Sequence, residues 1–165
     1  MTNRDFQNIY RKLYMPLCMY ALRIVEDTDA ANDVVQTTFM RVWGLVREAH
    51  DISSPETYLY RSVRNAALGM LKEQGRFSAL ADDREEVSEE EMDTAERDAR
   101  LWQAIDAMPP RRREIFLMSK RDGMTYAAIA DELALSVKTV ENQISKALAT
   151  LRADSRNLTL VLSLF

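Results

Sequence analysis

A polar face on one predicted helix carries side chains suited to reading a nucleic acid. In the stretch SVKTVENQISKALATLR (136–152), that face presents Lys138, Thr139, Asn142, Ser145 and Lys146, with Glu141 as its acid. A lysine can donate to guanine, Asn142 and Gln143 can each bind adenine through paired hydrogen bonds, and Thr139 can touch a thymine methyl group or a phosphate. These residue types favour sequence-specific contacts in a DNA major groove.

A simpler explanation is an ordinary solvated face on a bundle helix. The turn Ala134-Leu135-Ser136 nevertheless joins this helix to TYAAIADELALS (125–136), and Ser136 and Thr125 are expected N-caps, which is typical of a helix-turn-helix. In that motif the start of the second helix meets the base edges, while Lys146, Arg152 and the cluster around Arg112 would hold phosphates. The expected buried side is Tyr126, Ile129, Ala130, Leu133, Val137, Val140, Ile144, Ala147, Leu148 and Leu151.

A second group of residues combines aromatic rings with cations. The segment YLYRSVRNAALGML (58–71) interleaves Tyr58, Tyr60, Arg61, Arg64 and Asn65. Unpaired bases stack on rings while nearby cations neutralise their backbone, so this segment favours single-strand binding. The alternative is packing in the core, which we expect for one of the two tyrosines and for Phe39, while Trp43 suits either the core or a partner contact.

The elements that position these residues are all predicted to be helical. The chain has four Gly and four Pro, and no clean alternating strand is visible. Helices are expected around residues 6–24, where Pro16 predicts a kink or two short helices, and then over 29–48 and 53–73, the last with Pro55 at its first position. Further helices are expected over 95–108, from Pro110 to the αL position of Gly123, and in the helix-turn-helix.

Charge divides the chain into two neutral or basic ends and an acidic middle. Residues 74–100 hold 4 basic and 10 acidic side chains, whereas residues 101–165 hold 9 basic and 7 acidic ones. Few aliphatic residues and many like charges in the middle suggest a flexible linker, or else a solvated acidic helix face. The overall net charge of −4 therefore does not exclude nucleic-acid binding.

Several classes of function are disfavoured. One Cys (Cys18) and one His (His50) allow neither a disulfide framework nor a Cys/His zinc site, so no metal or other cofactor is expected. An all-α enzyme is a poor alternative because no nucleophile-base set or Gly-rich phosphate loop is present, and the acids of 82–98 lack a hydrophobic wall. No apolar run approaches the length of a membrane span, and we expect a reduced, cytoplasmic protein.

In this order, YALRIVEDTDAANDVVQTTFMRVW (20–43), YLYRSVRNAAL (58–68), an acidic linker and AIDAMPPRRREIFLMSKRDGMTYAAIADELALSVKTVENQISKALATLR (104–152) resemble the extracytoplasmic-function sigma factors of bacterial RNA polymerase. The resemblance covers roughly residues 5 to 153. The ending VENQISKALATLR and the short apolar tail are most similar to the Bacteroidetes branch. The resemblance implies two small helical domains: a sigma-2-like bundle over 1–73 and a sigma-4-like helix-turn-helix over 96–153, with a linker over 74–95 and a tail over 154–165.

The resemblance also implies partners and sites. The helix DVVQTTFMRVW would grip the β′ clamp helices of core polymerase through Asp33, Gln36, Arg41 and Trp43. The −10 element would be recognised and held open by Tyr58, Arg61, Arg64 and Asn65. The −35 element would be read by Lys138, Thr139, Asn142, Gln143, Lys146 and Arg112, on a domain that also docks on the β flap. An anti-sigma factor clamping the two units is implied as well.

Some points stay open at this level. The loop 47–58 is where the family shapes its −10 specificity, and Asn65 is the one base contact assigned here. Glu141 could accept from a cytosine amine, or pair with Lys138 or Lys146. The tail LTLVLSLF (158–165) could pack on its own bundle, which we favour, occupy a partner's groove or promote association. An alternative reading is a LuxR-type helix-turn-helix regulator that acts without binding core polymerase.

Overall fold

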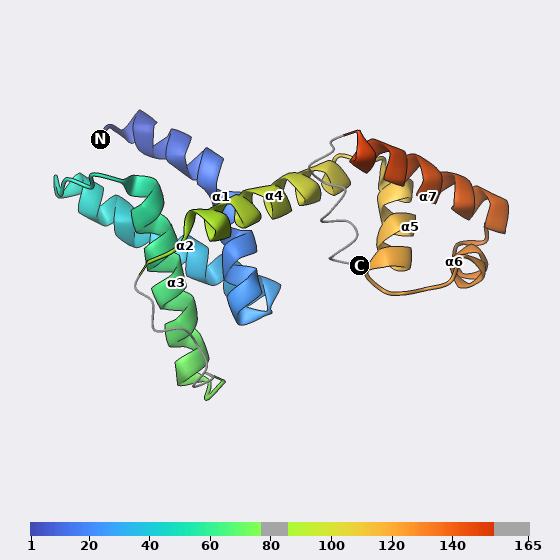
Figure 1. The fold of residues 1–165 in the computed structure, drawn as a ribbon, viewed down its shortest axis with the longest axis horizontal. Coiled ribbons are helices and arrows are strands. Elements are labelled where there is room, and N and C mark those ends of the chain that lie inside the picture. The colour runs from blue at the N-terminus through green and yellow to red at the C-terminus, as the bar shows by residue number, and fades with distance from the viewer. Residues whose placement is uncertain (77–85, 154–165) are drawn as a thin grey trace. The chain divides into compact units, whose positions relative to one another are not determined.

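The structure, a computed structural model, describes residues 1–76 and 86–153 (Figure 1). Over these ranges it contains seven α-helices and no strand, which confirms the all-α prediction. The chain divides into two compact units, Met1–Ala99 and Arg100–Phe165. Expectations for the apolar tail and for the middle of the acidic segment, 77–85, fall outside the described residues.

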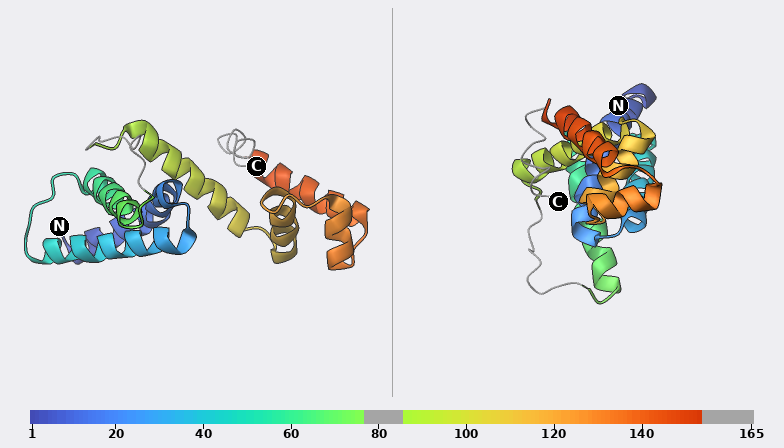
Figure 2. Two further views of the ribbon diagram at one scale, coloured as in Figure 1. Left: turned by 90° about the horizontal axis from the view of Figure 1, so that it is seen from below. Right: turned by 90° about the vertical axis from the view of Figure 1, so that its right-hand side faces the viewer.

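Three long helices form most of the first unit: α1 (Asn3–Val25), α2 (Thr28–Arg47) and α3 (Pro55–Glu73). Each packs against the other two, and the left view of Figure 2 shows the three helices side by side. The first two helices are N-capped by side-chain oxygens: the Thr2 hydroxyl accepts from the Asp5 amide, and the Asp27 carboxylate accepts from the Ala30 amide. Pro55 starts α3 as predicted.

Pro16 does not divide the first helix. The expectation of two short helices is wrong, because α1 is assigned as one helix through this residue. A proline inside a helix removes one backbone hydrogen bond, which destabilises the helix when nothing else compensates for the loss. Here Pro16 is itself buried, and the neighbouring Leu13 and Leu17 are 2% and 0% exposed, so core packing offsets the lost bond.

The fourth helix, α4 (Glu89–Asp106), begins earlier than its sequence pattern predicted, since we expected a start at residue 95. Its first turn is fixed by a capping box: the Ser88 hydroxyl accepts from the Glu91 amide at 3.2 Å, and the Ser88 amide donates to the Glu91 carboxylate at 2.8 Å. Val87 and Ala95 are buried in the core of the first unit. Residues 89–95 of the predicted linker are therefore helical.

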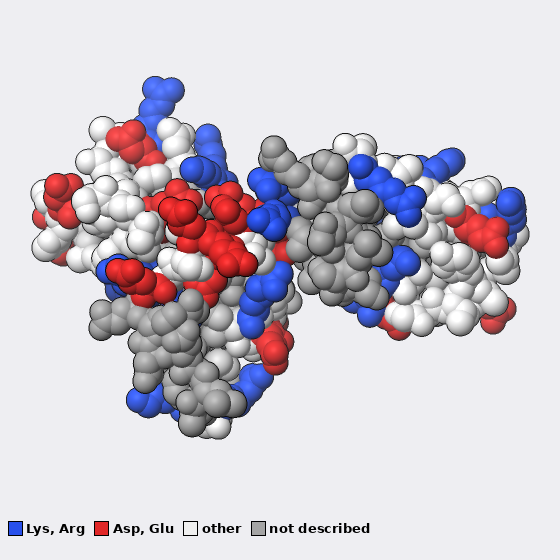
Figure 3. All heavy atoms as spheres, viewed as in Figure 1, with Lys and Arg blue, Asp and Glu red and all other residues white. Residues whose placement is uncertain are grey.

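Acidic side chains gather on the face of the first unit where α4 begins (Figure 3). This agrees with the alternative of a solvated acidic helix face for that part of the segment. Glu89, Glu90 and Asp93 are exposed there. One acid behaves differently: Asp98 is 4% exposed and forms an ion pair with Arg23 of α1.

The second unit contains the end of α4, α5 (Pro110–Lys120), α6 (Tyr126–Leu133) and α7 (Val137–Arg152). Its core joins residues from all four helices, including Leu101, Ile115, Ile129 and Ile144. Gly123 has φ +67°, the αL conformation predicted for it. Most of the predicted buried side of the helix-turn-helix is buried, and Tyr126, Leu133 and Leu148 are partly buried against the same core. Val137, at the first position of α7, is 43% exposed, so its predicted burial is wrong.

None of the helices described is long and apolar enough to cross a membrane.

Candidate nucleic-acid and protein-binding surfaces

The turn of the helix-turn-helix is built as the sequence predicted. Ala134 ends α6 in the left-handed conformation, with φ 54° and ψ 44°. The Thr125 hydroxyl caps α6 by accepting from the Ala128 amide at 3.1 Å, and the Ser136 hydroxyl caps α7 by accepting from the Thr139 amide at 3.1 Å. Figures 1 and 2 both show α6 next to the N-terminal end of α7.

The polar face of α7 holds two of the four predicted base readers, and one predicted phosphate contact, in exposed positions. Lys138, Asn142 and Lys146 are exposed on α7. The Lys138 ammonium lies 3.8 Å from the Glu141 carboxylate, and 78% of the lysine side chain is accessible. The pairing of Glu141 with Lys138, one of the alternatives left open by the sequence, is therefore the one the structure shows. Exposed pairs of this kind are weak, so Lys138 can exchange Glu141 for a DNA acceptor.

Three predicted DNA contacts are already engaged within the protein. The Thr139 hydroxyl lies 2.8 Å from that of Ser136. The Arg112 guanidinium on α5 donates to the Gln143 side-chain oxygen on α7 at 3.1 Å, and both residues are half-buried. Because these side chains are held in place, any DNA contact that they make starts from a fixed geometry.

The other two arginines of the cluster have partners of their own. Arg111 pairs with Glu114 at 3.1 Å, and the Arg113 guanidinium donates to the Asp106 backbone carbonyl at 2.8 Å. Arg113 thus satisfies a carbonyl at the end of α4, where a helix has no intrahelical partner to offer. The cluster is consequently structural in part and is not simply a row of free cations.

In the first unit, a groove between α2 and α3 brings together most of the side chains predicted to bind a single strand. The groove has a volume of about 520 Å³ and is lined by Arg41, Leu45, Tyr58, Arg61, Ser62, Asn65 and Ala66. Arg61 and Asn65 are exposed, and the Tyr58 ring is half-buried. The predicted combination of ring, guanidinium and amide therefore exists on one surface.

Arg64 does not belong to that surface. It is 6% exposed, because it lies four residues after Tyr60 and three before Ala67, on the buried side of α3. DNA contact by Arg64, as expected from the sequence, does not fit this burial, and we remove it from the candidate site. Tyr60 is fully buried and Tyr58 is not, which confirms that one of the two tyrosines is a core residue.

The loop before α3 lines a second, smaller hollow. It has a volume of about 240 Å³ and is lined by Asp51, Ile52, Ser53, Ser54, Thr57, Tyr58 and Arg61. Sequence reasoning assigned none of the loop residues. The structure places them beside Tyr58 and Arg61, so the loop borders the α2–α3 groove. The hydroxyl side chains of Ser53 and Ser54, just before Pro55, are the sequence feature that could have indicated a polar site here.

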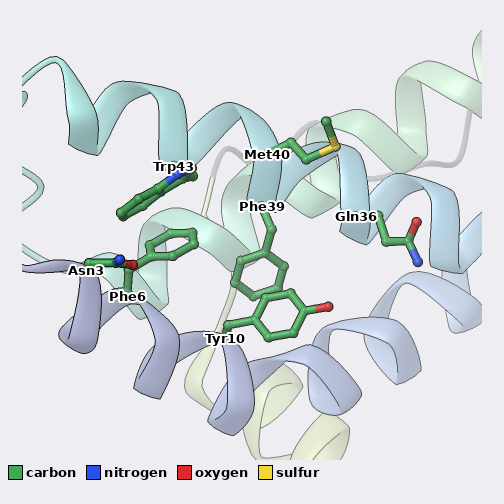
Figure 4. A pocket seen from close by; sticks show the side chains of 7 residues that line it. All are labelled: Asn3, Phe6, Tyr10, Gln36, Phe39, Met40 and Trp43. Carbon is green, nitrogen blue, oxygen red and sulfur yellow. The ribbon is translucent and has the colours of Figure 1, made fainter.

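A different groove runs between α1 and α2. Figure 4 shows Asn3, Phe6, Tyr10, Gln36, Phe39, Met40 and Trp43 around it, and its volume is about 550 Å³. Two predicted core-polymerase contacts, Gln36 and Trp43, lie here, and Asp33 is exposed on the same helix. Trp43 is half-buried against Phe6, with ring centroids 4.7 Å apart, so it has both a packing role and an accessible edge.

The exposed methionine of this groove was missed in the sequence. Met40 is 76% exposed, although it is apolar. Its spacing of four residues from Gln36 and three from Trp43 places it on the same side of α2 and would have revealed it. An exposed methionine beside aromatic rings is typical of a protein-binding surface.

Comparisons with known proteins agree with the division of the chain into two units. The family Sigma-70 region 2 matches residues 9–77, and the family Sigma-70, region 4 matches residues 98–151. The chain is 26% identical to the ferric citrate uptake sigma factor FecI of Escherichia coli over 150 residues, which cover 86% of each protein. It is also 29% identical to the probable RNA polymerase sigma factor RfaY of Xanthomonas campestris and to the ECF RNA polymerase sigma factor SigE of Mycolicibacterium smegmatis.

The extent of these matches differs. The alignments with RfaY and SigE cover 81% and 80% of this chain but 36% and 54% of those proteins. A solved structure, that of CnrH in complex with the cytosolic domain of CnrY, matches 92% of this chain and 88% of its own, with 24% identity and a TM-score of 0.38. The two family matches, in this order and across both units, show that the chain belongs to the sigma-70 family, and the ECF sigma factor SigE among its relatives supports the extracytoplasmic-function group.

Proposed function

We propose that the protein is an RNA polymerase sigma factor that binds core polymerase, recognises the −35 and −10 promoter elements and initiates transcription. The observation that carries the proposal is that each unit matches a sigma region, 2 or 4, and presents side chains suited to binding nucleic acid. One surface suits duplex DNA and the other suits an unpaired strand, which is what promoter melting requires.

The −35 element is read as duplex by α7. Lys138, Asn142 and Lys146 are exposed on its polar face, and Ser136 fixes its first turn. In a helix-turn-helix the first residues of the second helix meet the base edges in the major groove. Thr139, Gln143 and Arg112 contribute from the border of this face, and the same unit docks on the β flap.

The −10 element is bound as a single strand in the α2–α3 groove. Tyr58 supplies a ring on which a base can stack, Arg61 a cation for the backbone, and Asn65 an amide for a base edge. Melting is favoured because the groove binds the unpaired strand and gains nothing from the paired one.

The outer face of α2 attaches the protein to the β′ clamp helices of core polymerase. Asp33, Gln36 and Trp43 lie on this helix, beside an accessible apolar groove that contains Met40. Affinity for isolated DNA is low, because each DNA surface is small and the acids of residues 74–100 oppose binding. Promoter binding therefore depends on polymerase.

The remaining parts of the proposal follow from this assignment. Polymerase acts in the cytoplasm, and we place the protein there as a regulatory subunit without catalysis of its own. An anti-sigma factor that engages both units is its inhibitory partner. The sequence ending VENQISKALATLR and the apolar tail support a place in the Bacteroidetes branch of the group.

The test is a pull-down with core polymerase, followed by run-off transcription on genomic fragments. Wild-type protein should bind core and start transcription at defined sites. Asn65→Ala should bind core normally and form fewer open complexes. Failure of the wild-type protein to bind core would overturn the proposal, and tight promoter binding without polymerase would favour a LuxR-type regulator.

A further inference from the structure

Arg41 lies on a different side of α2 from the residues with which the sequence grouped it. Gln36 and Trp43 line the groove toward α1, whereas Arg41 lines the groove toward α3. The helical phase agrees, since Arg41 is five residues from Gln36 and therefore about 140° from it around the axis. A partner seated on the α1 side of α2 does not have to reach Arg41.

The position of Arg41 is fixed by the core beneath it. Its neighbours Phe39 and Val42 are 3% and 1% exposed, and the Thr38 hydroxyl donates to the Val34 carbonyl at 2.8 Å inside the same helix. The Arg41 side chain itself is exposed. A cation on a rigid backbone with a free side chain is suited to binding a ligand at a fixed place.

The surroundings of Arg41 suit an unpaired nucleic-acid strand. Arg41 and Arg61 come from different helices and line one groove, and no carboxylate is among the described residues that line it. The Tyr58 ring and the Asn65 amide line the same groove, and Leu45 and Ala66 are its apolar residues. Guanidinium groups bind phosphate strongly, and an aromatic ring beside cations is typical of single-strand sites.

We propose that Arg41 binds a backbone phosphate of the unpaired promoter strand, as a second cation beside Arg61, and is not a contact to core polymerase. The inference rests on the proposed function of the protein as a sigma factor. Two guanidiniums on two helices fix the strand at two phosphates and so set which base faces Tyr58 and Asn65. An acidic protein segment is the competing occupant of this groove.

The experiment uses full-length protein reconstituted with core polymerase. The probe is a labelled non-template single strand spanning the −10 element of a promoter recovered by run-off transcription. The variants are Arg41→Ala, Arg41→Lys and Arg47→Ala, because Arg47 is an exposed arginine in the last turn of the same helix and does not line the groove. Affinity for core and affinity for the strand are measured separately, the latter at several salt concentrations.

We expect Arg41→Ala to bind core as the wild type does and to bind the strand about three- to tenfold more weakly, with a salt slope smaller by about 0.7. Arg41→Lys should keep the wild-type slope, and Arg47→Ala should keep both the slope and the affinity. A wild-type slope in Arg41→Ala would overturn the proposal, as would weaker core binding or an equal effect of Arg47→Ala. If the wild type itself did not bind core, the proposed function would be the part that fails.

Discussion

The Nε of Arg112 on α5 donates a 3.1 Å hydrogen bond to Oε1 of Gln143 on α7, so two predicted DNA ligands are tied to each other before any DNA is bound. The bond turns the Gln143 oxygen toward α5. A paired hydrogen bond to adenine needs both the oxygen and the nitrogen of an amide. The exposed amide of Asn142 meets that need better than the half-buried one of Gln143.

Asn142→Ala should therefore relax −35 recognition more than Gln143→Ala. We expect Asn142→Ala to lose about 1–3 kcal/mol of discrimination at one base pair, and Gln143→Ala to lose less than about 1 kcal/mol. The measurement is holoenzyme affinity for promoters that differ at single −35 base pairs. Ser145→Ala, on the same exposed face, is the control and should leave discrimination unchanged; a larger loss in Gln143→Ala would contradict the argument.

The packing of α4 on the first unit should depend in part on one ion pair. Arg23 on α1 donates to both carboxylate oxygens of Asp98, at 2.7 and 3.0 Å, and this pairing raises the pKa of the Arg23 guanidinium. Asp98 is buried, while Arg23 is half-exposed, so removing one partner should cost about 1–3 kcal/mol, less than for a fully buried pair. We expect Arg23→Met to speed hydrogen exchange of the amides in residues 89–99, where α4 packs on the first unit.

A suitable control is the exposed pair between Lys12 and Glu56, whose atoms are 3.7 Å apart. Lys12→Met removes a cation from the same helix, α1, and should leave exchange in α4 unchanged because exposed pairs contribute little. Equal protection of residues 89–99 in Arg23→Met and in the wild type would show that the capping box and the packing of Val87 and Ala95 hold the segment without the ion pair.

The positions of most helices could be predicted because their signals are local. Apolar residues at helical spacing mark α2 and α3, and Pro55, Thr125 and Ser136 mark the starts of their helices. The start of α4 was missed although Ser88 and Glu91 form a capping box there, because its first turns carry few apolar residues. The Arg23–Asp98 pair, which ties the middle of α4 to α1, joins positions 75 residues apart and has no local signal.

The candidate site was predictable in residue type more than in geometry. Tyr58, Arg61 and Asn65 share one side of α3, as their spacing implies. Arg64 is three residues from Arg61 and four from the buried Tyr60, so its spacing fits either side, and its burial depends on how α3 packs. That Arg41 faces α3 depends on how two helices pack, which the sequence of either helix alone does not show.

Alkaline pH should destabilise the first unit through Cys18. Burial raises the pKa of this thiol from 9.0 to about 11. The stabilisation is complete below the unfolded pKa and is lost as pH rises through about 11, because the unfolded chain releases its proton first. Burial, with the charge of Glu96, also raises the pKa of Tyr60 and acts in the same direction at higher pH.

Denaturation followed by Trp43 fluorescence in a Trp102→Phe background should show this effect. We expect the free energy of unfolding to fall by an amount on the order of 2 kcal/mol between about pH 8 and pH 11. Cys18→Ala is the comparison: it is less stable at neutral pH, because it leaves a small cavity, and its stability should fall less steeply with pH. Equal slopes in the two proteins would mean that Cys18 is not the titrating group.

Replacing the left-handed residue in the turn of the helix-turn-helix with glycine should stabilise the second unit. Ala134 has φ 54°, a conformation that costs an alanine roughly 1–2 kcal/mol and costs glycine almost nothing. Part of that gain is offset by the greater freedom of glycine in the unfolded chain, so Ala134→Gly should stabilise the second unit by about 0.5–1 kcal/mol. Trp102 fluorescence in a Trp43→Phe background reports this unit, since Trp102 packs on its core.

An alanine-to-glycine substitution in α7 should have the opposite effect on the stability of the second unit. Ala149 is exposed in the last turn of α7, where glycine costs up to about 1 kcal/mol relative to alanine, so Ala149→Gly should destabilise the same unit. Both substitutions remove one methyl group from an exposed alanine, and they differ in backbone conformation alone. If both substitutions destabilised the unit to the same degree, the backbone strain at Ala134 would not reduce its stability, and the gain predicted for glycine there would be refuted.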